Sequence, residues 1–351
     1  MTRQTNGHHH SPSSSPHFSN GDHSSVNPFA GQNIGYLRLA VVGDSGVGKT
    51  SFARQFTETL PEVLSHDWEP LSPNHSEDDD YKRTDTLIEK FSSTMMEIPW
   101  DNMDADDEVP ARNLVFVDTP GYGSVVDAQL NFDMFMSYVG QTFEEKNKRI
   151  SPFTEVSNNE LMRSLVTGVG AHKFIDVVFY LVVHRLKPID VEYMRLISEK
   201  ANVVPVICKV DTQSEQEVRD LKVQVLRTLK EQGVSIYTFR IDYDRLIHMA
   251  ENGQVGGPPF AVCNTAVKPA SADPNDHIAF TPASNELPLL RKLVLETQIT
   301  NIRQFTVKKF INWRGKHLAQ QQQQHQQLQQ QQPIQQQQAY YQQHQYQQTA
   351  R

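Results

Sequence analysis

The chain has 351 residues, of which 38% are hydrophobic, so it is long enough to bury the core of one large domain. Its net charge of -8 argues against nucleic-acid binding and against direct membrane binding, because such surfaces need an excess of Lys and Arg. Two cysteines are too few for a disulfide framework, so we expect a reducing compartment. The most apolar stretch, residues 177–183, is far shorter than the about 20 residues of a membrane span. By default we expect the cytoplasm.

Both ends of the chain differ in composition from the middle. Residues 1–35 are rich in Ser, Pro and His and nearly lack aliphatic side chains, so they cannot bury enough surface to offset the entropy of ordering. In the other tail, residues 316–351, 20 of the 32 residues from Gln320 to Arg351 are glutamine, and no apolar heptad supports a coiled coil. We therefore predict two disordered tails around one domain at residues 36–315.

Between the tails, strand-like and helix-like segments alternate, which is typical of an α/β fold with a mostly parallel central sheet and helices on both faces. A segment with three prolines and an acidic run, residues 57–81, is expected to be a long loop or insertion. The expected strands are residues 37–42, 113–117, 177–183, 203–207 and 259–263. The expected helices are residues 191–200, 215–232 and 287–310.

A phosphate-binding loop directly follows the first expected strand. The pattern G-x-x-x-x-G-K-[ST] predicts a backbone that wraps a phosphate with successive N–H donors at the start of a helix. Lys49 would reach the β- and γ-phosphates, and the Thr50 hydroxyl would bind Mg²⁺. The preceding strand is the context that this motif requires, and it favours a P-loop NTPase fold. The expected nucleotide-binding residues are Gly43, Asp44, Ser45, Gly46, Val47, Gly48, Lys49, Thr50 and Ser51.

A second motif, Asp-Thr-Pro-Gly, begins at the end of another expected strand. In a P-loop protein, Asp118 would hold Mg²⁺, and the N–H of Gly121 would bind the nucleotide and sense its γ-phosphate during catalysis. Tyr122 stands where many small GTPases have a glutamine that orients water, so hydrolysis is expected to be slow.

The sequence leaves the efficiency of hydrolysis open. A threonine must reach both Mg²⁺ and the γ-phosphate, and Thr84 and Thr86 precede an expected strand at a suitable place. We favour Thr86 as the catalytic threonine and metal ligand. If neither threonine reaches Mg²⁺, the protein is a poor hydrolase or a scaffold that holds nucleotide without hydrolysing it.

A third motif selects the base. The buried strand at residues 203–207 delivers Lys209 and Asp211 in a K-x-D arrangement. The Asp211 carboxylate can accept two hydrogen bonds from the N1–H and 2-amino groups of guanine, which adenine does not offer, while the Lys209 stem lies along the base. Discrimination by buried hydrogen bonds of this kind is strong. The three motifs together predict binding of GTP or GDP with Mg²⁺.

The stretch around the third motif resembles the G domain of septins. The family pattern L-K-P-x-D has its counterpart at residues 186–190, and V-N-x-x-P-V-I-A-K-A-D-T has its counterpart at residues 201–212. Looser matches extend the resemblance to residues 37–306. It implies a septin-type G domain, other septin-like subunits as partners, and a role in cytoskeletal assembly or scaffolding at the cell cortex or division site.

The chain also departs from the family pattern. Cys208 and Val210 replace alanines, which is tolerable because Lys209 and Asp211 are kept. The element R-x-Y-P-W-G, which in the family helps to build the subunit contact beside the nucleotide, has no counterpart at residues 264–288. Association is therefore expected to be weak without partner subunits. The alternative to an assembly subunit is a monomeric signalling or paraseptin-type GTPase.

Overall fold

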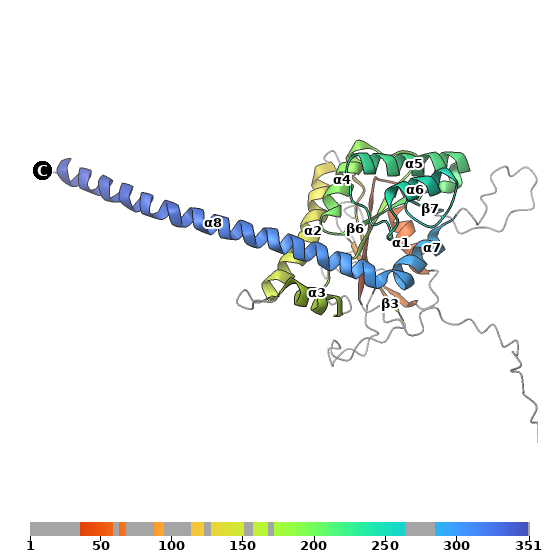
Figure 1. Ribbon diagram of the computed structural model, residues 1–351, viewed down its shortest axis with the longest axis horizontal. Coiled ribbons are helices and arrows are strands. Elements are labelled where there is room, and N and C mark those ends of the chain that lie inside the picture. The colour runs from red at the N-terminus through yellow and green to blue at the C-terminus, as the bar shows by residue number, and fades with distance from the viewer. Residues whose placement is uncertain are drawn as a thin grey trace, which may run out of the picture. The chain divides into compact units, whose positions relative to one another are not determined.

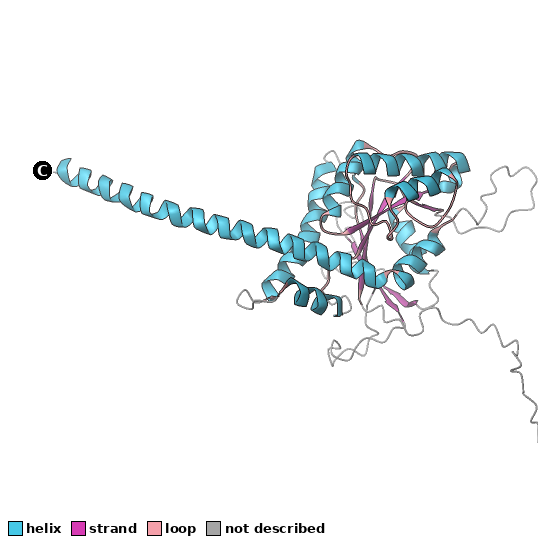
Figure 2. Cartoon of the chain, viewed as in Figure 1, coloured by secondary structure: helices cyan, strands magenta, loops and turns pink. Residues whose placement is uncertain are grey.

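Strands and helices alternate along the described part of this computed structural model, and the helices lie on both faces of a central sheet (Figure 1). In Figure 2 the central magenta strands lie among the cyan helices, whereas the strands at the lower right project beyond them. Residues 1–35, which were predicted to be disordered, lie outside the described residues. The described residues are 36–58, 63–67, 88–94, 114–122, 128–150, 157–167, 172–263 and 285–349.

The order of the elements follows the alternation that the sequence predicts. In chain order they are β1 (Leu37–Gly43), α1 (Lys49–Glu58), β2 (Val63–Asp67), β3 (Ile88–Thr94), β4 (Leu114–Asp118), α2 (Ala128–Arg149), α3 (Asn158–Thr167), β5 (Val177–Val182), α4 (Pro188–Ser198), β6 (Asn202–Cys208), the 3-10 turn η4 (Val210–Thr212), α5 (Glu215–Glu231), α6 (Tyr243–Glu251), β7 (Phe260–Val262), α7 (Leu287–Lys292), the π-helical turn η6 (Leu293–Thr297) and α8 (Ile299–Thr349).

The described strands form one sheet in the order β2-β3-β4-β1-β5-β6-β7. The five strands from β4 to β7 in this order are parallel, whereas β3 pairs antiparallel with both β2 and β4. An antiparallel edge on an otherwise parallel sheet is common in α/β folds. The predicted α/β fold with a mostly parallel sheet is therefore confirmed.

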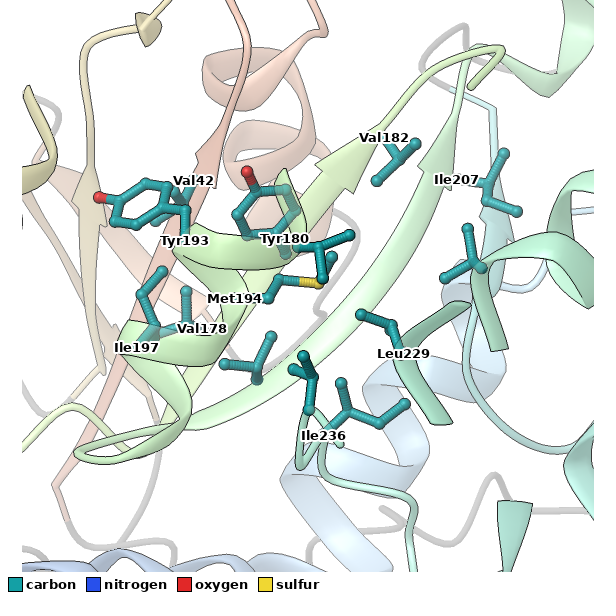
Figure 3. Packing of buried hydrophobic residues seen from close by; sticks show 14 of the residues in the cluster. Val42, Val178, Tyr180, Val182, Tyr193, Met194, Ile197, Ile207, Leu229 and Ile236 are labelled. Atoms are coloured by element: carbon teal, nitrogen blue, oxygen red, sulfur yellow. The ribbon is translucent and has the colours of Figure 1, made fainter. Parts of the chain in front are cut away.

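Strand β5 shows why the central strands are continuous apolar runs. Successive side chains of a strand point to opposite faces of the sheet. Tyr180 lies on the face covered by α2, α4 and α5, in a cluster with Met194 and Leu229 (Figure 3). Phe179 lies on the other face, where its ring centroid is 5.3 Å from that of Phe56 in α1. Because both faces are covered, both sets of side chains are apolar.

Helix α8 is joined to the amino edge of the sheet by buried polar groups. The side-chain amide of Asn202, the first residue of β6, donates hydrogen bonds to the carbonyl of Asp176 (2.8 Å), the carbonyl of Ile302 (3.1 Å) and the hydroxyl of Thr306 (3.0 Å). Asn202 is only 2% exposed, so these bonds satisfy a polar group that water cannot reach.

The glutamine-rich tract differs from the prediction of a disordered tail at residues 316–351, because α8 continues through it to Thr349. Glutamine has a favourable helix propensity, and the packed beginning of α8 supplies the costly nucleus. The side chains of residues 319–326 are exposed. The helix there is therefore an extension without packing partners among the described residues.

Other differences from the prediction concern the segment at residues 57–81 and three helices. Residues 57–81 are not only a loop, because Thr57 and Glu58 end α1 and Val63–Asp67 pairs with β3 at the sheet edge. An edge strand has one neighbour and does not require the apolar run of a buried strand. Helices α2, α3 and α6 were not predicted at all. No helix in the described ranges is both long and apolar enough to cross a bilayer.

Candidate functional site

The predicted phosphate loop lies at the carboxyl end of β1 and leads into α1. Gly48 has φ +97, a backbone conformation that side chains with a Cβ rarely adopt. At Gly43, a Cβ atom would lie 2.6 Å from the carbonyl oxygen of Leu181 in β5. The loop thus needs glycine at one position for its turn and at another for the close approach of a neighbouring strand.

Lys49 is the first residue of α1, and its side chain curls over the loop. The Nζ atom donates to the carbonyl oxygens of Gly43 (3.2 Å) and Asp44 (2.7 Å). Lys49 is only 8% exposed, and this burial lowers its pKa, although the nearby charges of Asp118 and Asp44 act in the opposite direction. A partly desolvated cation therefore lies among the backbone groups of the loop, as a phosphate-binding lysine requires.

Thr50 and Asp118 meet at the base of the loop. The Thr50 hydroxyl donates to Asp118 Oδ2 at 2.5 Å, and Asp118 is 7% exposed at the end of β4. Hydroxyl and carboxylate oxygens are ligands that Mg²⁺ prefers, and Mg²⁺ commonly uses one or two carboxylates together with substrate phosphates and water. The pair therefore fits the predicted magnesium site. Thr84 and Thr86 lie outside the described residues, so their predicted role stays a prediction.

Gly121 lies directly against the phosphate loop. A Cβ atom at Gly121 would be 2.4 Å from the Cα atom of Ser45 and 3.0 Å from Lys49 Nζ. The preceding Thr119 hydroxyl donates to the carbonyl of Val41 at 2.8 Å and fixes this segment to the end of β1. The structure thus brings the second predicted motif into contact with the first.

The base-recognition pair follows β6. Lys209 adopts the left-handed conformation with φ 55° and ψ 38°, and it precedes the turn η4, which holds Asp211. The Oδ1 atom of Asp211 is buried and has no hydrogen-bond partner within the described part of the chain. A buried carboxylate oxygen without a donor is costly. The donor groups of guanine would satisfy this oxygen, so the residues fit the predicted ligand.

One cavity of 350 Å³ brings parts of the first and third motifs together with Tyr122, the residue that follows the second motif. Its volume lies within the range of about 300 to 1,000 Å³ that is common for small-molecule sites. It is lined by residues 44–47 of the phosphate loop, Tyr122, residues 181–185 at the carboxyl end of β5 and just beyond it, Lys187 and Asp190 at the start of α4, and Lys209.

Lys187 was not predicted as a site residue, although it belongs to the L-K-P-x-D pattern. Its Nζ atom forms an ion pair with Asp44 of the phosphate loop and lies 5.9 Å from the centre of the Tyr122 ring. Desolvation alone would raise the pKa of Asp44, but the hydrogen bonds from Lys187 and from the Ser45 N–H lower it. The start of α4 therefore supplies a second cation at the loop.

Asp190 and Tyr180 complete the part of the site that the sequence analysis missed. The Asp190 carboxylate is 3% exposed and accepts hydrogen bonds from the hydroxyls of Tyr122 and Tyr180, the latter at 2.9 Å. Burial, together with the hydrogen bond and charge of Asp190, raises the pKa of Tyr122, so its hydroxyl stays protonated. The L-K-P-x-D pattern was the only sequence signal for Asp190, and Tyr180 had none beyond its apolar strand.

The chain is similar in sequence to known proteins. The family model described as Septin matches residues 35–273. The chain is 26% identical over 237 residues to Septin-1 of Drosophila melanogaster, covering 64% of this chain and 56% of that protein. It is 31% identical over 204 residues to Septin-2B of Xenopus laevis, covering 57% of this chain and 49% of that protein. The matched region thus spans about half the length of these relatives.

One solved structure is similar over a larger share of the chain. It is the septin GTPase domain from Chlamydomonas reinhardtii, with 22% sequence identity and a TM-score of 0.46, and the match covers 80% of this chain and 98% of that one.

Proposed function

Because this chain belongs to the septin family, we propose that it binds GTP or GDP with Mg²⁺ and acts as a subunit of a septin-like assembly. The observation that carries the proposal is the 350 Å³ cavity, at which the phosphate loop lies close to Lys209 of the base-recognition pair. A phosphate-binding and a guanine-binding element at one cavity are what a guanine nucleotide requires.

Each predicted residue has a role in this proposal. The backbone of residues 43–51 and Lys49 bind the phosphates, and Asp211 with Lys209 binds guanine. Thr50, Asp118 and Thr86 hold Mg²⁺, which neutralises charge on the phosphates when it is bound. Gly121, in contact with the loop, donates its N–H to the γ-phosphate.

We propose that hydrolysis is slow. The Tyr122 hydroxyl donates to the buried Asp190 carboxylate, so it is occupied and does not replace the water-orienting glutamine of faster GTPases. The same observation supports the second candidate, a scaffold that holds nucleotide without hydrolysing it. Single-turnover hydrolysis with Mg²⁺ separates the two, since only the GTPase releases phosphate from bound GTP.

The assembly role rests on family membership. We propose that the chain associates with other septin-like subunits in the cytoplasm, at the cytoskeleton or cell cortex. Without those partners its association is weak, because the R-x-Y-P-W-G element is missing from the sequence. Light scattering at low and high salt, with nucleotide present, tests this. Long filaments from the pure chain would show that the element is not needed, and a monomer in the presence of septin partners would favour a signalling GTPase.

Nucleotide identity is the most direct test of the binding proposal. Denaturing the purified full chain should release GDP or GTP, and recovery of an adenine nucleotide would reject the proposal. Asp211→Asn should weaken GTP binding at least about 100-fold and favour xanthosine nucleotides, whose 2-position accepts rather than donates a hydrogen bond. The matched control is Asp244→Asn, which changes an exposed aspartate of α6 that forms an ion pair with Lys230 of α5.

A further inference from the structure

A buried carboxylate fixes the start of α4. Pro188 occupies the first helical turn, and Asp190 lies two residues later, where a negative charge is favoured by the helix dipole. The carboxylate accepts one hydrogen bond from the backbone N–H of Lys187 at 2.7 Å, in addition to those from the hydroxyls of Tyr122 and Tyr180. With three donors and almost no exposure, this side chain has a single well-defined position.

The partners of Asp190 are themselves held by the core. Tyr180 is fully buried in β5, and its ring makes an edge contact with Tyr193 of α4, with centroids 6.0 Å apart (Figure 3). The Tyr122 ring makes an edge contact with Phe132 of α2 at 5.4 Å. Asp190 therefore ties the residue after Gly121 to the central sheet.

A second connection runs from the start of α4 to the phosphate loop. Lys187 pairs with Asp44, and the Asp44 carboxylate also accepts the N–H of Ser45 at 2.6 Å. Ser45 is the residue whose Cα atom would clash with a Cβ at Gly121. The contacts thus close into a ring, which we name the α4 ring: Gly121, Tyr122, Asp190, Lys187, Asp44 and Ser45.

We propose that Asp190, Tyr122 and Lys187 are positioning residues that hold Gly121 against the phosphate loop and so set how strongly the site distinguishes GTP from GDP. The proposal rests on the proposed function, in which the Gly121 N–H contacts the γ-phosphate. GDP lacks that phosphate. A looser ring therefore weakens GTP binding and leaves GDP binding almost unchanged.

The test compares dissociation constants of the full chain for GDP and for a non-hydrolysable GTP analogue, both with Mg²⁺. Tyr122→Phe removes one hydroxyl from the α4 ring and keeps the aromatic contact. We expect it to lower the ratio of GTP-analogue affinity to GDP affinity about fivefold to tenfold, in the lower part of the range typical for coupled sites. GDP affinity should stay within about twofold.

Two controls match the chemistry of the change. Tyr243→Phe removes a hydroxyl that donates to the carbonyl of Val234 at 2.6 Å, away from the cavity, and should leave the affinity ratio unchanged. Lys187→Met should lower the ratio as Tyr122→Phe does, whereas Lys187→Arg keeps the cation and should restore it. Lys230→Met, which breaks an exposed ion pair with Asp244, controls for the loss of a lysine.

Hydrogen exchange supplies a readout that needs no nucleotide. The peptide containing Gly121 should exchange faster in Lys187→Met, because Lys187 is linked to Gly121 through the α4 ring. Tyr122→Phe and Lys187→Met decide the question. Equal losses of GTP and GDP affinity, or an unchanged ratio in both variants, would overturn the inference while the binding proposal stands. A wild-type chain that binds no guanine nucleotide would overturn both.

Discussion

Two buried aspartates, one near each end of β5, illustrate how differently the two edges of the sheet are built. Asp190 lies at the carboxyl edge and accepts hydrogen bonds from Tyr122, Tyr180 and the Lys187 N–H. Asp176 directly precedes β5 at the amino edge and is 1% exposed. Both carboxylates are removed from water, but only the first is surrounded by donors.

The Asp176 carboxylate is incompletely satisfied. Its Oδ2 atom accepts the backbone N–H of Arg38 at 3.2 Å, and its Oδ1 atom has no hydrogen-bond partner in the described ranges. Burial raises the pKa of Asp176 to about 6, although the Arg303 charge and the Arg38 N–H act to lower it. A fully bonded carboxylate can position a site, whereas this one destabilises the fold once it is ionised.

The difference indicates that the polar groups at the two edges of the sheet have different functions. At the carboxyl edge, polar groups converge on a cavity, and their function is to bind a ligand. At the amino edge, polar groups join the strands to α8, and their contribution is to stability. Substitutions at the two edges should therefore separate binding from folding.

Lys49→Ala should have the largest effect and act on binding alone. It removes the cation at the centre of the phosphate loop, and we expect nucleotide affinity to fall about 1,000-fold, which corresponds to about 4 kcal/mol. The melting temperature without nucleotide should change by no more than about 2 °C. Calorimetric titration and thermal unfolding measure the two effects. A variant that loses stability as well as affinity would break the division between the edges.

The pH dependence of stability should reveal Asp176. Its pKa is about 6 when folded and 3.8 in the reference state, so the unfolded chain loses this proton first as the pH rises. The folded state is therefore destabilised progressively between pH 3.8 and 6, by about 3 kcal/mol at 1.36 kcal/mol per pKa unit. Relative to Asp176→Asn, which cannot titrate, the wild type should lose about 2 kcal/mol of this between pH 4 and pH 7, because the unfolded carboxyl is already partly ionised at pH 4. Denaturant unfolding at both pH values measures it, and parallel curves would contradict the assignment.

Asn202→Ala should destabilise the fold with little effect on binding. Truncation removes one of the two side-chain donors to the buried carbonyls of Asp176 and Ile302 and leaves only the Thr306 hydroxyl, at a cost of about 1 to 2 kcal/mol in the free energy of unfolding. Nucleotide affinity should stay within about twofold, because the cavity lies at the opposite edge. A large loss of nucleotide affinity, measured where all of the variant is folded, would show that the two edges are coupled.

The fold was predictable where the chemistry is local. Strands buried on both faces leave continuous apolar runs, and the phosphate loop needs its glycines at fixed spacing, so β1, β5 and β6 and the loop could be found from the sequence. Helix α2 also left a signal that was not used, since Phe132, Phe135, Val139 and Phe143 have the spacing of a helix face. Weak patterns of this kind are hidden by the many polar residues between them.

The α4 ring could not be predicted, because it depends on the fold. Asp44, Tyr122 and Asp190 lie in three separate segments, the last of them the first turn of α4, that meet only when β1, β4 and β5 are neighbours in the sheet. A pattern such as L-K-P-x-D marks residues as special and says nothing about which side chains they bind. Side-chain hydrogen bonds between distant segments require the assembled structure.

The smallest effect is expected from the glutamine-rich half of α8. The packed half ends in a stack of rings: Phe310 is fully buried, the Trp313 ring lies 6.0 Å from it, and the His317 ring lies 4.8 Å from Trp313. Beyond this stack the side chains of residues 319–326 are exposed. Among the side chains of α8 that the structure describes, packing therefore stops before Gln320.

Deleting residues 320–351 should change the melting temperature by no more than about 2 °C and leave nucleotide affinity unchanged, because exposed helix turns contribute little to a folded domain. The control deletes residues 310–351 and removes the ring of Phe310, which lies 4.7 Å from Phe174 and 5.3 Å from Phe143; that variant should lose about 3 to 5 kcal/mol of stability. Circular dichroism of the first deletion also tests the helix itself, since removing a helical tract lowers the helical signal and removing a disordered one does not. A large loss of stability from the first deletion would mean that the tract docks on the domain or on a second copy, and the comparison of the two edges would then have to include it.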